Sequence, residues 1–173
     1  YQVGRRKAGR YMREMDITYI PMKHGFLYLT AIIAWYSRCI VGWDVDDTLD
    51  TTMVINACKK AFKVAKPLII NSDQGSQFTS DKYIEFIRDN GIRQSMDGKS
   101  RWADNIMIER WFRSFKYEEA YLTEYANLKE AREAIGRYIY TYNFERSHQS
   151  IGNKRPAEVY YPVMLLEAAR AAA

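Results

Sequence analysis

The sequence is poor in the residues that build disulfide frameworks, thiolate metal sites and proline-rich linkers. Its 173 residues include two cysteines, two histidines and four prolines. Cys39 and Cys58 have neither the number nor the spacing of a zinc site or a disulfide framework, so a reducing cytoplasm is the expected compartment. Both cysteines fall in apolar segments, where we expect them to be small core residues.

Long apolar runs are missing as well. No run approaches the roughly 20 residues of a membrane span, and Tyr1–Met15 lacks the pattern of a signal peptide. A composition of 47% hydrophobic and 27% charged residues is typical of a globular domain. We therefore expect one domain with a real core and no membrane partner.

Positive charge is in modest excess, with a formal net charge of +5. This value is compatible with a polyanionic partner and does not by itself indicate one. The basic residues gather in two places. The first cluster, expected to be a solvated end, is Arg5, Arg6, Lys7, Arg10 and Arg13, and the second surrounds Glu109 with Arg101, Arg110, Arg113 and Lys116.

The hydrophobic pattern predicts an α/β fold. Three strands with short connections indicate an antiparallel meander. The helical stripe that follows, capped by Asp50 or Thr51, predicts a crossover to a strand parallel to the first. The expected elements are strands at Met15–Ile20, Phe26–Ala34 and Cys39–Val45, a helix at Thr51–Ala65, a strand at Leu68–Ile70, a helix at Ser80–Asn90, a strand at Ile92–Ser95, a loop at Asp97–Arg101, and helices from Asp104 to about Leu122 and from about Leu128 to Asn143.

Helical spacing also predicts which side chains pack. The second helix is expected to bury Tyr83, Ile84, Phe86 and Ile87. The helix from Asp104 is expected to bury Ile108, Trp111, Phe112, Phe115 and Leu122.

Three acids are candidates for a metal site. Asp73 follows the apolar strand Leu68–Ile70, where the backbone holds a carboxylate rigidly beside a possible cleft. Asp16 lies in the first strand and Glu109 in the long helix. Simpler interpretations stay open, because Asp73 also suits an ordinary turn and Glu109 also suits a solvated ladder with Arg113 and Lys116.

Several short segments occur in a definite order along the chain: Met15–Pro21, Asn71–Ser80, Ser95–Lys99, Asp104–Arg110, Arg113–Glu118, Tyr142–His148 and Pro156–Glu158. Asp73 and Glu109 are separated by 35 residues (109 − 73 − 1). This order and this gap resemble those of the DDE transposases of bacterial insertion sequences, which share the integrase catalytic core with retroviral integrases.

The resemblance implies a ribonuclease H-like fold: a five-stranded mixed sheet, its first three strands antiparallel, flanked by helices. Asp16, Asp73 and Glu109 match the family's metal-binding acids, which implies Mg²⁺ or Mn²⁺, expected as two ions in one site. Arg113 and Lys116 match positions that approach DNA in related integrases. Further DNA contacts are expected from Lys99, Arg101, Arg110, Arg146 and His148, although His148 also suits a purely structural role.

The implied reaction is in-line attack at phosphorus, with water as the nucleophile for strand cleavage and a DNA 3′-hydroxyl for strand transfer. Expected partners are DNA element ends, target DNA and further copies of the chain, in a bacterial cytoplasm. No helix-turn-helix precedes Asp16, so an end-recognition module is expected outside this sequence. The expected division is a basic leader or linker remnant at residues 1–14, the catalytic core at 15–161 and a frayed helical tail at 162–173.

Two departures from the family pattern keep other functions open. Such proteins usually carry Asp where this chain has Ala34, and Trp shortly before the first acid where it has Met12–Met15. One alternative is therefore an inactive nucleic-acid-binding or assembly domain of the same fold. The other is a ribonuclease H-like nuclease that cuts without joining strands.

Overall fold

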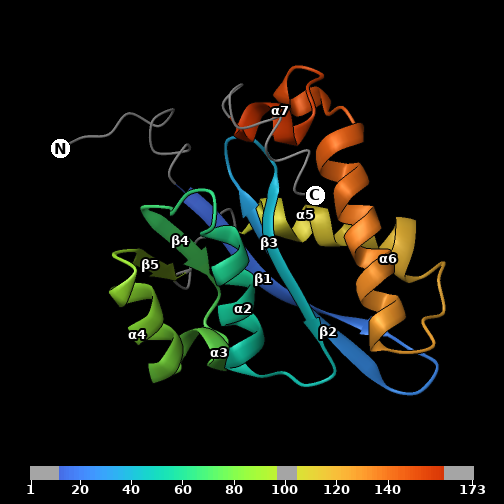
Figure 1. The fold of residues 1–173 in the computed structure, drawn as a ribbon, viewed down its shortest axis with the longest axis horizontal. Coiled ribbons are helices and arrows are strands. Elements are labelled where there is room, and N and C mark those ends of the chain that lie inside the picture. Colours follow the sequence, from blue (N-terminus) through green and yellow to red (C-terminus); the bar gives the residue numbers. More distant parts are fainter. Residues whose placement is uncertain (1–11, 97–104, 162–173) are drawn as a thin grey trace.

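A computed structural model describes residues 12–96 and 105–161 (Figure 1). Lys99, Arg101 and the expected loop at Asp97–Arg101 lie outside these ranges. The elements are β1 (Met12–Pro21), β2 (Phe26–Ala34), β3 (Ile40–Asp46), α2 (Thr51–Ala61), β4 (Ile69–Ser72), α3 (Ser76–Thr79), α4 (Asp81–Asp89), β5 (Arg93–Met96), α5 (Ile106–Phe115), the π-helical η1 (Lys116–Ala120), α6 (Leu128–Tyr140), the π-helical η2 (Thr141–Glu145), the 3₁₀-helical η3 (Gln149–Ile151) and α7 (Pro156–Tyr160).

The five strands form one mixed sheet in the order β3-β2-β1-β4-β5. The first three strands pair antiparallel, whereas β4 pairs parallel with β1 and β5 pairs parallel with β4. Helix α2 is the crossover from β3 to β4, as expected, and its start is capped by Asp50. The predicted topology is confirmed.

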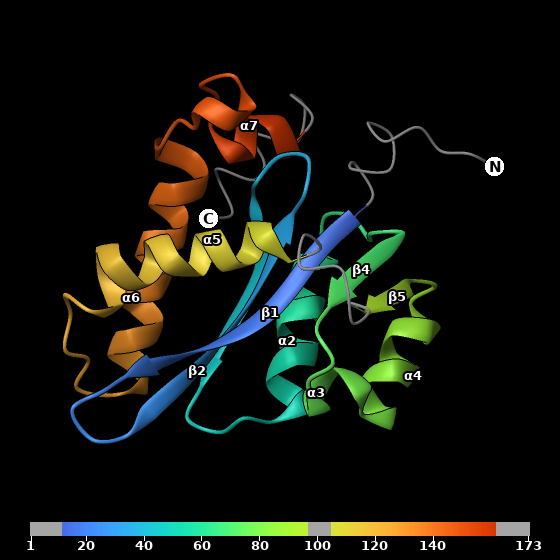
Figure 2. The ribbon, with the colours of Figure 1, turned by 180° about the vertical axis from the view of Figure 1, so that it is seen from behind.

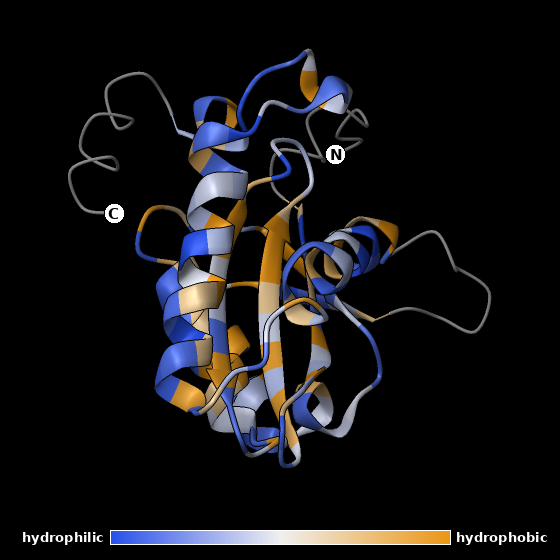
Figure 3. Ribbon diagram, turned by 90° about the vertical axis from the view of Figure 1, so that its right-hand side faces the viewer, coloured by the Kyte–Doolittle hydropathy of each residue, from blue (hydrophilic) through white to orange (hydrophobic). Residues whose placement is uncertain are grey.

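Helices cover both faces of the sheet. In Figure 1, α2 and α4 lie in front of it, and Figure 2 shows α5 on the opposite face, over β1 and β2. Each face has its own buried cluster, and β1 serves both because successive side chains of a strand point to opposite faces. Ile20 belongs to the cluster under α5 and α6, and Met15 to the cluster under α2 and α4. In Figure 3, the orange of hydrophobic residues is concentrated on the strands and on the helix surfaces that face them.

The expectation of a solvated end is wrong for Arg13, whereas Arg5, Arg6, Lys7 and Arg10 of the first basic cluster lie outside the described residues. The side chain of Arg13 is 4% exposed, and β1 begins at Met12, three residues earlier than expected. The guanidinium donates to the carbonyl oxygens of Ala61 (3.1 Å) and Ala65 (2.6 Å), and to the hydroxyl of Tyr160 (2.6 Å). Arg13 therefore joins the first strand, the end of α2 and the C-terminal helix α7.

Some helix ends and packing positions differ from the sequence-based expectations. Helix α2 ends at Ala61 rather than Ala65, with Phe62 as its C-cap. The expected burial of Leu122 and Ile84 is wrong, because these side chains are 76% and 40% exposed. The π-helical turn η1 breaks the 3.6-residue period on which the position of Leu122 was predicted. In α4, the buried side chains are those of Tyr83 and Ile87.

The two cysteines behave as expected from their apolar surroundings. Cys39 and Cys58 are buried, and burial raises the pKa of both thiols. Among the described residues, no helix is both long and apolar enough to cross a bilayer.

Candidate active site

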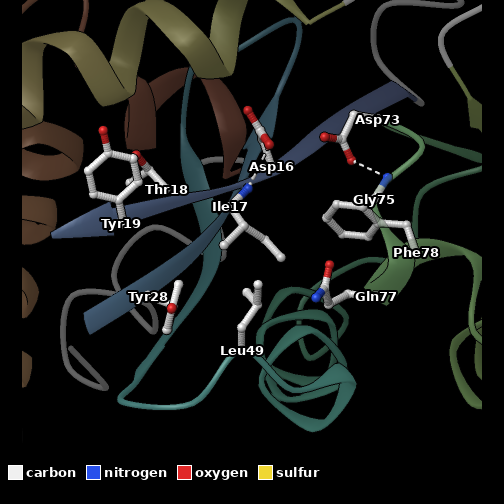
Figure 4. Close-up of a pocket in the computed structure, with 10 residues that line it drawn as sticks. All are labelled: Asp16, Ile17, Thr18, Tyr19, Tyr28, Leu49, Asp73, Gly75, Gln77 and Phe78. Carbon is white, nitrogen blue, oxygen red and sulfur yellow. Dashed lines mark hydrogen bonds between the residues drawn. The ribbon is translucent and has the colours of Figure 1, made fainter. Parts of the chain in front are cut away.

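Asp16, within β1, and Asp73, directly after β4, lie near each other because β1 and β4 are neighbouring parallel strands. Glu14 of β1 is paired with Asn71 of β4, so two residues further along each strand Asp16 and Asp73 stand side by side. Asp73 directly follows Ser72, the last residue of β4. The two carboxylates line the same hollow, shown in Figure 4.

The turn after β4 holds Asp73 in place. Its Oδ1 atom accepts a hydrogen bond from the backbone N–H of Gly75 at 2.9 Å, the turn in which an Asp side chain bonds two residues ahead. A Cβ atom on residue 75 would lie 3.0 Å from that same oxygen. Glycine at position 75 therefore leaves room for the carboxylate, and the turn interpretation of Asp73 holds together with its place at the site.

Glu109 approaches Asp16 from the helix above the sheet. It lies exposed in the first turn of α5, and a second hollow is lined by Asp16, Glu109, Arg113 and Lys116. The Lys116 ammonium lies 4.6 Å from the ring centroid of Tyr19 on β1. Two cations therefore share the second hollow with two carboxylates, which is the charge pattern that a phosphate beside a metal ion requires.

The three acids form two pairs that share Asp16 rather than one tight triad. Within residues 12–96 and 105–161, no group of three or more His, Cys, Asp or Glu side chains meets closely enough to hold a metal ion. Mg²⁺ is a hard ion that is usually bound by one or two carboxylates together with waters and substrate phosphates. The two carboxylates that line each hollow fit that requirement.

Glu14 is the buried acid beside this site that sequence reasoning missed. It is 0% exposed and lies two residues before Asp16, on the same face of β1. Its Oε2 atom accepts from the backbone N–H groups of Met107 and Ile108, each at 3.0 Å, and Oε1 accepts from Trp35 Nε1. Burial raises the pKa of Glu14 to about 7, although these bonds oppose the rise. A glutamate in an apolar strand, on the same face as Asp16, was the available signal.

The remaining predicted DNA contacts have different surroundings. Arg110 is exposed on α5, next to Glu109. Arg146 forms an ion pair with Glu118 at 2.6 Å, between η1 and η2. His148 is half-buried against Tyr142, with ring centroids 4.6 Å apart. Arg113 and Lys116 therefore line a hollow with Asp16 and Glu109, whereas Arg146 and His148 are not among the residues that line either hollow.

Comparison with known families agrees with this arrangement. Two models described as integrase core domain match residues 8–101 and 90–156. The chain belongs to the integrase core domain family.

Similar sequences come from bacterial insertion elements. The chain is 36% identical over 147 residues to the transposase for insertion sequence element IS904 of Lactococcus lactis, which covers 83% of this chain and 58% of that protein. It is 30% identical over 146 residues to the putative transposase InsK for IS150 of Escherichia coli, covering 83% of this chain and 52% of that protein. The chain thus spans little more than half the length of these relatives.

Solved structures of similar shape are retroviral integrase cores. The HTLV-2 integrase catalytic core domain in complex with magnesium matches with a TM-score of 0.72 at 21% identity, over 88% of this chain and 97% of that one. The catalytic core domain of BIV integrase matches with a TM-score of 0.69 at 19% identity, over 94% of this chain and 98% of that one. The fold is therefore the ribonuclease H-like fold of these cores.

Proposed function

We propose that this chain is the catalytic core of a DDE-type transposase, which cuts DNA and joins strands with the help of Mg²⁺ or Mn²⁺. The observation that carries the proposal is the position of Asp16, which lines one hollow with Asp73 and another with Glu109. Each hollow offers two carboxylates, and Asp16, Asp73 and Glu109 are the residues that would hold the divalent ions, proposed to be two in number. The magnesium complex of the HTLV-2 core and the transposase relatives support the same interpretation.

The protein groups in the site have separable roles. When bound, the ions would stabilise charge on the attacking and leaving oxygens of an in-line displacement at phosphorus. Asp16, Asp73 and Glu109 supply the oxygen ligands. Arg113 and Lys116, in the hollow of Glu109, neutralise phosphate charge and orient the DNA strand. These groups bring the reacting phosphate and the attacking oxygen together without a covalent bond between DNA and protein.

DNA element ends and target DNA are the proposed substrates, and the active form is proposed to contain more than one copy of the chain. Joining two ends to one target requires both ends to be held together. Because the chain covers only part of its relatives, recognition of the ends is assigned to a module elsewhere in the whole protein. An inactive assembly domain is less favoured, since all three acids are present around the two hollows.

The first prediction tests the acids directly. Asp73→Asn and Glu109→Gln should each reduce metal-dependent cleavage and strand joining by at least about 100-fold, because each removes a charged ligand of the ions. DNA binding without metal should stay within about twofold of wild type. Cleavage of a branched DNA oligonucleotide that represents the joined product, followed on gels with Mg²⁺ and with Mn²⁺, measures the first effect. Fluorescence anisotropy in EDTA measures the second.

A matched control is Asp81→Asn, which alters an exposed acid in the first turn of α4, away from both hollows. This variant should cleave at the wild-type rate. Full activity in either site variant would remove the metal-ligand assignment. Cleavage without detectable joining in the wild-type protein would favour the nuclease alternative.

A further inference from the structure

The start of α5 is capped by a side chain from another element. Its own N-cap residue, Asn105, makes no side-chain capping hydrogen bond within the part of the chain that the structure describes. A helix leaves its first backbone N–H groups without partners inside the helix. An N-cap side chain normally accepts from the second or third of these groups.

Glu14 accepts hydrogen bonds from both of these N–H groups. Counting from Ile106 as the first helical residue, Met107 and Ile108 are the second and third, and both N–H groups donate to one Glu14 oxygen at 3.0 Å. The positive end of the helix dipole favours a carboxylate there. Trp35 donates to the other oxygen and holds the side chain from the β2 side.

The two backbone segments linked by Glu14 each carry a candidate ligand. Asp16 is two residues along β1 from Glu14, and Glu109 is the residue immediately after Ile108. One connection between these two acids therefore runs through a buried carboxylate and two backbone hydrogen bonds. If this connection loosens, α5 can shift on the sheet and change the separation of Asp16 and Glu109.

We propose that Glu14 is a positioning residue that fixes the α5 backbone against β1, so that Glu109 faces Asp16 at the spacing that divalent metal binding needs. This role rests on the metal-dependent function proposed above. Glu14 itself touches neither metal nor DNA, because its oxygens are engaged by Met107, Ile108 and Trp35 and the residue is fully buried.

Glu14→Gln tests the role with little change in shape. A side-chain amide has only one acceptor oxygen, so it cannot serve the two backbone N–H groups and Trp35 at once. The Mg²⁺ concentration for half-maximal cleavage of the branched oligonucleotide should rise about tenfold, in the range seen when the outer partners of metal ligands are removed. Binding of Mn²⁺ without DNA, followed by electron paramagnetic resonance, should weaken by a similar factor.

Asp44→Asn is the matched control for a general loss of stability. Asp44 on β3 is also a buried acid of the sheet, but its carboxylate is paired with Lys60 of α2 at 3.1 Å and with Arg132 of α6 at 3.7 Å. This variant should leave the half-maximal Mg²⁺ concentration within twofold of wild type, even where its melting temperature falls as far as that of Glu14→Gln. Glu14→Asp, which keeps the charge and withdraws the oxygens by one methylene, serves the same comparison if Glu14→Gln does not fold.

The outcomes separate the two proposals. A half-maximal Mg²⁺ concentration that is unchanged within twofold in the Glu14 variant overturns the positioning role and leaves the proposed function intact. An equal rise in the Asp44 control also overturns it, because the effect then follows from stability alone. A wild-type protein without metal-dependent cleavage or Mn²⁺ binding overturns the function, and the positioning role with it.

Discussion

His148 illustrates how the surroundings of one residue decide between two roles. Its ring packs on Tyr142, and its Nε2 atom is buried without a hydrogen-bond partner among the residues that the structure describes. Its backbone N–H donates to Lys154, closing the bridge around η3. Burial lowers the pKa of His148, and the nearby Arg146 lowers it further, whereas a backbone hydrogen bond with Tyr142 and the charge of Glu118 oppose the shift. These contacts favour a structural role over a phosphate contact.

The lowered pKa of His148 leads to a test at the residue scale. Because the folded pKa of His148 lies below its ordinary value of 6.5, the unfolded chain takes up the proton first as the pH falls. The contribution of His148 to the free energy of unfolding should therefore decrease as the pH falls from about 7 through 6.5 towards the folded pKa, and level off below it. The raised pKa of Glu14 acts in the opposite direction over the same range, so wild type is compared with His148→Gln at each pH. Urea unfolding at pH 7.5 and pH 5.5 should show that the stability difference between the two proteins shifts in favour of His148→Gln at the lower pH. An unchanged difference would exclude this contribution.

At the scale of elements, the packing of α2 on β3 depends on a missing side chain. A Cβ atom at Gly42 would lie 2.3 Å from the carbonyl oxygen of Ala57 and 2.7 Å from the Cβ atom of Ala61. Both neighbours belong to α2, and backbone atoms there cannot move aside locally. Gly42 therefore sets the distance of the crossover helix from the sheet, and through it the entry of the chain into β4 and Asp73.

Gly42→Ala should destabilise the fold by about 2 kcal/mol, the usual cost of forcing extra atoms into a packed interface. Chemical denaturation measures the loss. Gly136→Ala is the matched control on α6, where the new methyl group would meet Trp43 at an ordinary 3.4 Å. That control should be neutral or gain up to about 1 kcal/mol, because Ala is the better helix former. A Gly42 variant as stable as wild type would mean that α2 relocates without cost.

At the scale of the whole molecule, charge is arranged around the site more selectively than the net value of +5 suggests. Arg113 and Lys116 share a hollow with Glu109 and Asp16. Other cations of the described residues have different surroundings: Arg146 pairs with Glu118, Lys60 pairs with Asp44, and Arg13 is buried. A DNA backbone that approaches Asp16 and Glu109 in this hollow therefore meets Arg113 and Lys116.

Lys116→Ala should weaken DNA binding and lower the salt dependence of binding by about one counterion, because one phosphate contact is lost. Anisotropy titrations at several salt concentrations, in EDTA, give the slope of log affinity against log salt. Lys63→Ala is the control, since Lys63 is exposed beyond α2 and lines neither hollow as described. The same slope for wild type and Lys116→Ala would exclude a phosphate contact at Lys116.

The departures from the usual pattern of the family meet at one place in the fold. Ala34 on β2 is paired with Arg13 on β1, the Arg13 side chain turns to α2 and α7, and the adjoining Trp35 and Glu14 form a hydrogen bond. Glu14 on β1 and Trp35 in the turn after β2 therefore place an acid and a tryptophan next to each other beside the site. Each departure examined alone left reduced activity open, whereas the structure joins the residues around them through the hydrogen bond between Trp35 and Glu14.

The sequence by itself determined the strand and helix order and the antiparallel meander with its crossover, because alternation, helical spacing and turn residues act locally along the chain. The three acids were predicted from the resemblance to the DDE transposases. Only the tertiary structure decided that Asp16 is shared between two hollows and that Glu14 caps α5. It alone also placed Arg13 inside the fold and Leu122 outside it. These features depend on contacts between residues far apart in the chain, such as Glu14 with Ile108 and Arg13 with Tyr160. No local pattern encodes such contacts, since the register and packing of whole elements create them.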